Sequence, residues 1–359
     1  PLRSSAASDV YKRQDLTPEE INLLNLDEHM WMWSRGVGFH HAGLAPIVKE
    51  FVEYLFLNRY IKYLFATETL ALGINMPAKS IYIDRLHKYD GIKTRPLTQS
   101  EFLQLSGRAG RRGIDDKGFA FLSYDKSVNR EWYSNLFTLK PNDLISAFSV
   151  NYSSILNLLN IYNVNEAVEL LRKSFFAYQN MYKTDKLEKL FRAKYGVLNQ
   201  LGFLNSDKGL VLTQTYRDNL IPAIYLFDKE KNKDIEFKLM YISSGITNER
   251  AEFALNDKFD SLLSSFNSSL ELVNKTEVAN GVGKPMKLNF SWFSVFYEYM
   301  KTRNIEYVIN KFGLNIGDFI KVAKEASELS KKLAVIYSDT EFEEINDIFN
   351  NKLIQKTMT

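Results

Sequence analysis

Three arginines and three glycines fall within ten residues of the chain, QLSGRAGRRG at 104–113. Gln104, Arg108 and Arg111 are spaced i, i+4 and i+7, so on a helix they would project from one face. Two guanidinium groups there could grip phosphate oxygens and offset the charge that develops on a γ-phosphate during phosphoryl transfer. Arg112 would point elsewhere. The alternative is a solvated basic helix end beside a glycine C-cap, and this stretch alone favours neither interpretation.

A helix is expected to position these arginines. Thr98 and Glu101 have the spacing of a capping box, which predicts a helix that begins at Thr98 and runs into the arginine motif. Gly107 and Gly110 would remove side chains beside the arginine face, so that a bulky anion could come close to the backbone. The helix would therefore set the geometry of the arginines.

A second motif, FATETLALGINMPAKS at 65–80, also has polar residues in a position to bind a ligand. An apolar strand is predicted to end at Ala66, directly before Thr67, and the following loop passes through Gly73 and Asn75. Open α/β sheets bind ligands at the carboxyl ends of their parallel strands. The alternative is an ordinary connection between two strands.

The elements around both motifs follow the pattern of parallel βα units. Strands are predicted at 36–40, 61–66, 80–84 and 118–124. Between the first two strands, one buried helix face is predicted by apolar residues at helical spacing, namely Leu44, Ile47, Val48, Phe51, Val52 and Leu55.

From about residue 128 helical patterns dominate. GFLNSDKGLVLT at 202–213 is expected to form two short extended pieces about a turn. Helices followed by such a hairpin suit a winged-helix module. The chain from about 226 to the end is expected to be helical again, interrupted by a polar loop at 280–285.

Composition limits the class of protein. The 359 residues are 45% hydrophobic and carry a net charge of +3, which by itself does not indicate nucleic acid as a partner. Because the sequence has no cysteine and four scattered histidines, disulfides and thiolate chemistry are excluded and a metal site is not expected. No apolar run approaches the ~18 residues that a membrane span needs. We expect a cytoplasmic protein that does not bind membranes, with residues 1–14 as a non-native leader.

Three motifs in this order resemble the second RecA-like domain of superfamily 2 DExH-box helicases: GVGFHHAGL, FATETLALGINMPA and EFLQLSGRAGRRGID. The most similar group is the superkiller type, the exosome-associated RNA helicases with their bacterial relatives, and LHKYDG at 86–91 also resembles it. The resemblance is dense over 36–125 and thinner beyond. It implies an α/β fold in which a RecA-like parallel-sheet domain is followed by winged-helix and all-α helical bundle (DSHCT-like) domains.

The resemblance implies a role for each residue of the nucleotide site. Arg108 and Arg111 would be catalytic fingers that reach the γ-phosphate of ATP, and Gln104 would also contact ATP. Gly73 and Asn75 would lie beside the nucleotide.

It also implies contacts with a nucleic-acid strand. Thr67 would touch the nucleic-acid backbone, and His40 and His41 belong to a motif that either touches substrate or braces its loop. GLNIGDFIKVAKEASELSKKLAVIY at 313–337 resembles the DSHCT helix that lines the path of the nucleic-acid strand. A buried apolar stripe is predicted on this helix, at Phe319, Val322, Ala326, Leu329 and Leu333. Lys321 stands there where the family usually has arginine, so the charge remains but forked phosphate contact is lost.

No phosphate-binding loop of the form GxxxxGK[ST] and no DExH box occurs in the sequence. VANGVGKP at 278–285 only imitates the loop, because Val278 and Pro285 replace a glycine and the hydroxyl residue. The main ligands of ATP and Mg²⁺ are therefore expected in a first RecA-like domain outside this sequence, and this chain alone is expected to be inactive. The expected layout is a second RecA-like domain at 15–127, a winged helix at 128–225 and a helical bundle at 226–359.

The function expected from the resemblance is that of the C-terminal part of an ATP-dependent RNA helicase. The full protein would translocate 3′ to 5′ on single-stranded RNA for processing or decay, with an exoribonuclease as a possible partner. Two alternatives are a repair-type DNA helicase of the same superfamily and a non-catalytic nucleic-acid-binding module. Genomic sequence upstream of Asp15 that encodes the missing motifs would exclude the second alternative.

Overall fold

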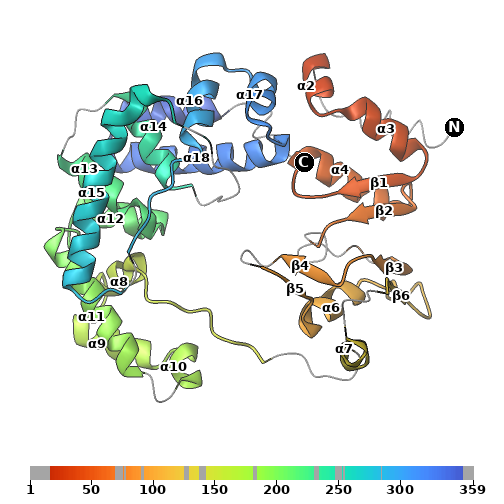
Figure 1. Cartoon of the computed structure of the whole chain (residues 1–359), viewed down its shortest axis with the longest axis horizontal. Helices are drawn as coiled ribbons and strands as arrows, with labels where there is room; N and C mark the ends of the chain where they lie inside the picture. Colours follow the sequence, from red (N-terminus) through yellow and green to blue (C-terminus); the bar gives the residue numbers. More distant parts are fainter. Residues whose placement is uncertain are drawn as a thin grey trace. The chain divides into compact units, whose positions relative to one another are not determined.

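The computed structural model divides the chain between Leu144 and Ile145 into two compact units, which we describe separately (Figure 1). The structure describes residues 17–68, 76, 78–89, 93–124, 129–136, 143–180, 184–229, 234–246, 253, 255–283 and 285–350.

The first unit begins with helices and a parallel strand pair. Its first elements are α2 (Pro18–Leu23), α3 (Leu26–Ser34), β1 (Val37–His40), α4 (Pro46–Leu57) and β2 (Tyr63–Ala66). β1 and β2 pair in parallel, and α4 connects them as the crossover helix that a parallel pair needs. All six apolar residues expected on one face between these strands are buried, so that prediction is confirmed.

A second parallel pair carries the arginine motif. Its elements are β3 (Ser80–Ile83), β4 (His87–Tyr89), β5 (Thr94–Pro96), α6 (Gln99–Ser106), β6 (Phe119–Leu122) and α7 (Arg130–Leu136). β3 pairs in parallel with β6, and β4 and β5 form an antiparallel hairpin that the sequence did not predict. A core cluster lies beneath these elements and consists of Ile83, Leu86, Leu97, Phe102 and Leu136. All four predicted strands are present, but among the described residues they form two separate pairs and not one sheet.

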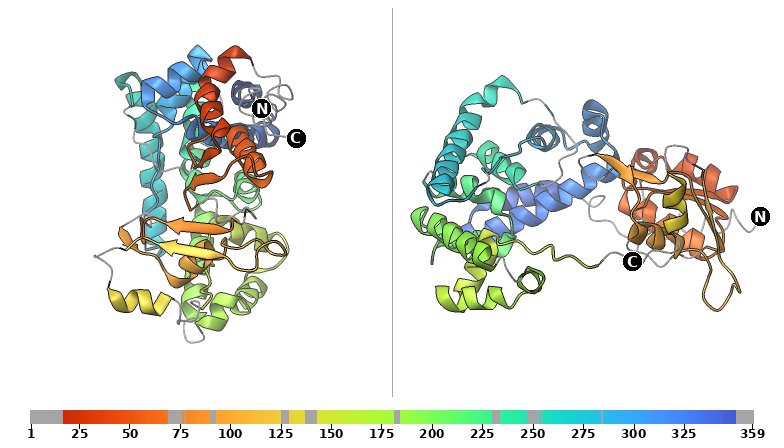
Figure 2. Two further views of the ribbon diagram at one scale, coloured as in Figure 1. Left: turned by 90° about the vertical axis from the view of Figure 1, so that its right-hand side faces the viewer. Right: turned by 60° about the horizontal axis from the view of Figure 1, so that its bottom comes forward.

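The second unit is helical. Its α-helices are α8 (Tyr152–Leu159), α9 (Val164–Arg172), α10 (Phe175–Gln179), α11 (Thr184–Gln200), α12 (Asp207–Thr215), α13 (Ile221–Lys229), α14 (Ile235–Ser244), α15 (Asp260–Ala279), α16 (Phe293–Thr302), α17 (Ile305–Phe312), α18 (Ile316–Tyr337) and α19 (Thr340–Phe349). Figure 2 shows them from two further sides. Contacts between residues far apart in the sequence join these helices. For example, the Tyr152 hydroxyl of α8 donates a hydrogen bond of 2.7 Å to the buried Glu277 carboxylate of α15.

The hairpin expected at 202–213 is wrong, because α12 occupies its second half. Ser206 is the N-cap of α12, and its hydroxyl accepts a hydrogen bond from the Gly209 N–H. Val211 and Leu212 are fully buried. A Ser-Asp-Lys-Gly sequence suits a turn and a helix start equally well, and burial of the apolar residues after it decides for the helix. The described residues of 143–350 contain no strand.

Candidate functional site

The arginine motif lies at the end of α6 and in the turns that follow it. The capping box is confirmed: the Glu101 N–H donates to the Thr98 hydroxyl at 3.3 Å, and the Glu101 carboxylate accepts from the Thr98 N–H at 2.7 Å. The helix ends at Ser106, with Gly107 as its C-cap. Arg108 and Arg111 therefore follow the helix, and the prediction that both share a helical face with Gln104 is wrong.

The backbone of Ala78 explains why the helix stops. The Ala78 N–H donates to the Arg108 carbonyl at 3.0 Å, and the Ala78 carbonyl accepts from the Gly110 N–H at 2.7 Å. Together these bonds form a parallel bridge between Ala78 and Ala109. Groups that would extend the helix are thus paired with the segment that enters β3. The sequence could not reveal this bridge because its two residues, Ala78 and Ala109, are 31 positions apart.

Glycine at 110 and 118 serves close backbone packing. Gly110 has a φ of +93°, and a Cβ on it would lie 3.2 Å from the Gly118 Cα. A Cβ on Gly118 would lie 2.4 Å from the carbonyl of Ala109. The space beside Gly110 that we expected to admit an anion is therefore filled by the chain itself.

Arg111 is held by a carboxylate four residues further on. Its Nε donates to Asp115 Oδ2 at 2.7 Å, and its Nη2 donates to Asp115 Oδ1 at 2.7 Å. The Arg111 side chain is 29% exposed and that of Asp115 is 6% exposed. The hydrogen bonds from Arg111 lower the pKa of Asp115 to about 2. Arg108 is half-buried, whereas Gln104 and Arg112 are exposed. The sequence analysis did not identify Asp115 as the partner of Arg111, although the i, i+4 spacing of the two residues indicates an ion pair.

The second motif begins where β2 ends. Thr67 is exposed, and its N–H donates to the His40 carbonyl of β1 at 3.1 Å. His40 is buried, with its Nε2 2.8 Å from the Glu53 carboxylate of α4, so it braces the strand against that helix. His41 is exposed. Gly73 and Asn75 lie outside the described residues.

An ion cluster links the two motifs, and the sequence did not predict it. Lys88 Nζ lies 3.0 Å from the Glu68 carboxylate, next to Thr67, and 3.1 Å from the Glu101 carboxylate at the start of α6. Arg95 also donates to Glu101 at 2.8 Å. These bonds hold the pKa of the Glu101 carboxyl far below its usual range, and the hydrogen bond from Arg95 has the largest effect. Lys88 lies in LHKYDG, and only the folded hairpin brings it to both carboxylates.

Lys321 lies in the second unit, on α18. It is exposed, whereas the apolar stripe predicted for this helix is buried as expected, at Phe319, Val322, Ala326, Leu329 and Leu333.

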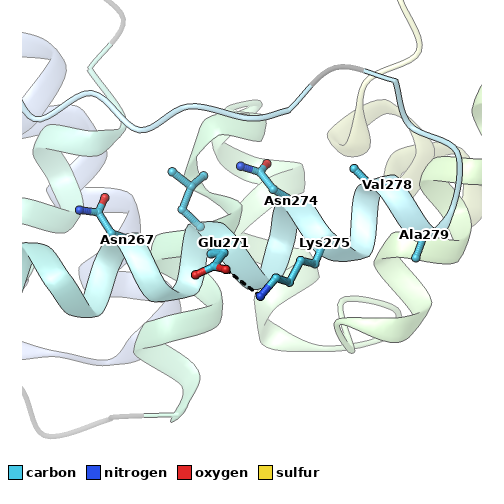
Figure 3. A pocket seen from close by; sticks show the side chains of 7 residues that line it. Asn267, Glu271, Asn274, Lys275, Val278 and Ala279 are labelled. Atoms are coloured by element: carbon cyan, nitrogen blue, oxygen red, sulfur yellow. Dashed lines mark ion pairs between the residues drawn. The ribbon is translucent and has the colours of Figure 1, made fainter.

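A hollow on α15 in the same unit contains none of the predicted residues (Figure 3). Leu270 and Val278 line it, and so do Glu271 and Lys275, which form an ion pair of 2.7 Å. One helix supplies its lining residues.

The described part of the chain contains no cluster of three or more histidine, aspartate or glutamate side chains that could hold a metal ion. It also contains no helix that is both long and apolar enough to cross a membrane.

Comparison with known proteins confirms the resemblance to superkiller-type DExH-box helicases. An uncharacterized helicase of Schizosaccharomyces pombe is 42% identical over 166 residues, which are 46% of this chain and 16% of the relative. The exosome RNA helicase MTR4 of Mus musculus is 41% identical over 165 residues, 46% of this chain and 16% of the relative. The probable helicase HelY of Mycobacterium tuberculosis is 39% identical over 165 residues, 46% of this chain and 18% of the relative.

The matched segment thus spans less than a fifth of the length of these relatives. No protein-family model matches the chain.

Proposed function

We propose that this chain is the C-terminal part of an ATP-dependent RNA helicase of the superkiller type. The observation that carries the proposal is the arginine loop, residues 107–115, which follows α6 and contains Arg108 and Arg111. A backbone bridge to Ala78 holds this loop, and Asp115 holds the guanidinium of Arg111. Relatives named as RNA helicases support the choice of RNA as substrate. The full protein would move 3′ to 5′ along single-stranded RNA during processing or decay in the cytoplasm.

In this proposal ATP lies against the arginine loop. Arg108 and Arg111 offset the negative charge that develops on the γ-phosphate, and Gln104 contacts the same nucleotide. Gly73 and Asn75 lie beside it. The phosphate-binding loop and the Mg²⁺ ligands belong to a first RecA-like domain outside this sequence, so hydrolysis requires both domains.

The proposed contacts with the nucleic-acid strand lie in two separate parts of the chain. Thr67 and His41 are exposed near the ends of β2 and β1, where a nucleic-acid backbone would be bound. Lys321 offers a further positive charge on α18, in a region that we assign to a DSHCT-like bundle. Helices between 128 and 225 would form the helical part of a winged-helix domain. An exoribonuclease is the proposed partner, because two relatives are named as exosome helicases.

Duplex unwinding tests this proposal. The full-length protein that contains this chain is given ATP and an RNA duplex with a 3′ overhang, the same duplex with a 5′ overhang, or the DNA equivalent of the first. We expect ATP-dependent unwinding of the 3′-overhang RNA. Faster unwinding of the DNA would favour a repair-type helicase, and binding without hydrolysis would favour a non-catalytic module.

A further inference from the structure

Residues 111–115 form a loop that is closed by hydrogen bonds between Arg111 and the residues that follow it. The N–H groups of Ile114 and Asp115 both donate to the Arg111 carbonyl at 3.0 Å, which turns the chain back on itself. The Arg111 N–H then donates to Asp115 Oδ2, also at 3.0 Å. In total the carboxylate of Asp115 accepts three hydrogen bonds from Arg111, one from the backbone N–H and two from the guanidinium.

The direction of these bonds decides which part of the guanidinium stays available. A guanidinium has five N–H donors arranged around a rigid plane. Asp115 takes Nε–H and one hydrogen of Nη2, which form one edge of that plane. The other edge, formed by Nη1 and the second hydrogen of Nη2, faces away from Asp115. Two neighbouring donors on one edge are the fork that binds two phosphate oxygens at once.

We propose that Asp115 is a positioning residue that fixes the guanidinium plane of Arg111 and presents its free edge to the γ-phosphate of ATP. This inference rests on the proposed function, because it assigns a task to Asp115 only if Arg111 is a finger. Asp115 itself does not touch the nucleotide. The Asp115 side chain is 6% exposed, while Arg111 keeps 29% of its own side chain accessible.

Fixing the plane removes rotamer freedom that a mobile arginine would have to lose in every catalytic cycle. Long side chains such as arginine lose conformational entropy when they are immobilised. A preformed ion pair places that loss in folding and not in the transition state. Asp115 should therefore affect kcat more than the KM for ATP.

ATP hydrolysis by the full-length protein tests the inference with two variants of Asp115 and one control. Asp115→Asn should lower kcat about 10- to 100-fold, because misplacing a catalytic group by about 1 Å can cost about 100-fold, and the KM for ATP should stay within about twofold of wild type. Asp115→Glu keeps the charge but moves the carboxylate by one methylene, and should lower kcat at least about threefold. Asp116→Asn is the matched control, since Asp116 is exposed, and should leave kcat unchanged.

Arg111→Ala separates the inference from the proposed function. Unchanged hydrolysis by Arg111→Ala would refute the finger assignment itself. Loss of hydrolysis in Arg111→Ala with wild-type kcat in Asp115→Asn would overturn only the role of Asp115. If Asp115→Asn fails to fold, Asp115→Glu decides, and a wild-type kcat there overturns the inference.

Discussion

Replacing Lys238 with methionine should destabilise the helical unit measurably. Lys238 lies on α14 with a side chain that is 5% exposed, and its Nζ contacts Asp339 at 2.7 Å and Glu341 at 2.6 Å at the start of α19. Methionine keeps most of the length and apolar character of the lysine stem. The Lys238 Nζ also lies 5.6 Å from the centroid of the Phe342 ring, so the substitution removes the charge, its hydrogen bonds and this cation–π contact.

The expected loss of folding free energy depends on which hydrogen bonds and water contacts Asp339 and Glu341 keep without the lysine. Removing one partner of a fully buried ion pair costs about 3–5 kcal/mol. Asp339 still accepts hydrogen bonds from the Glu341 and Phe342 N–H groups as the N-cap of α19, and the Glu341 side chain is 40% exposed and can turn to water. Both effects reduce the penalty, so we expect the free energy of unfolding to fall by about 2 kcal/mol.

Urea denaturation of the 359-residue chain, followed by circular dichroism at neutral pH, measures this loss. Lys275→Met is the matched control, because Lys275 and its partner Glu271 are 72% and 67% exposed, and its cost should stay below about 1 kcal/mol. Burial lowers the pKa of Lys238, but the bonds from Asp339 and Glu341 outweigh it and the pKa is raised. The contribution is thus fully present below the ordinary lysine pKa of 10.5 and is lost as pH rises through the higher folded value. Equal losses in both variants at pH 7 would refute this reasoning.

Three further predictions concern the arginine loop, the corrected helix and the ion cluster. Arg108→Ala or Arg111→Ala in the full-length protein should abolish ATP turnover in a phosphate-release assay and leave strand binding largely intact, whereas the exposed Arg112→Ala should retain turnover. Ser206→Ala should lower the free energy of unfolding by about 1 kcal/mol in urea, because it removes the N-cap of α12; no change would argue against that cap. Glu101→Gln should destabilise the chain at pH 7, and its difference from wild type should shrink as pH falls below the ordinary glutamate pKa of 4.5 toward the lowered folded value; a difference independent of pH in acid titrations would contradict the role of this carboxylate.

Local signals in the sequence predicted the local parts of the fold. The apolar spacing that includes Ile47 and Val52 gave the correct buried face of α4, and the capping box of Thr98 and Glu101 gave the correct start of α6. The stripe that includes Phe319 on α18 was also correct. Each of these features depends on neighbours within one helix, so periodicity and capping chemistry are sufficient to find them.

The sequence did not predict features that depend on partners far along the chain. The end of α6 is set by Ala78, and the start of α12 was mistaken for a turn because Ser206 can begin either structure. Lys88 meets Glu68 and Glu101 only after the β4–β5 hairpin forms. For the candidate site, the sequence identified Arg111 but not the carboxylate that orients it.

The bridge between Ala78 and Ala109 also bears on how this loop can evolve. Both hydrogen bonds of the bridge are made by backbone atoms, so they do not depend on which small side chain occupies position 78 or 109. Sequence drift at these two positions can leave the arginine loop attached to β3. Gly110 and Gly118 have no such freedom, because a methyl group at Gly118 would collide with the Ala109 carbonyl and Gly110 has a positive φ. Substitution should therefore be tolerated less well at Gly110 and Gly118 than at the two alanines between which the bridge forms.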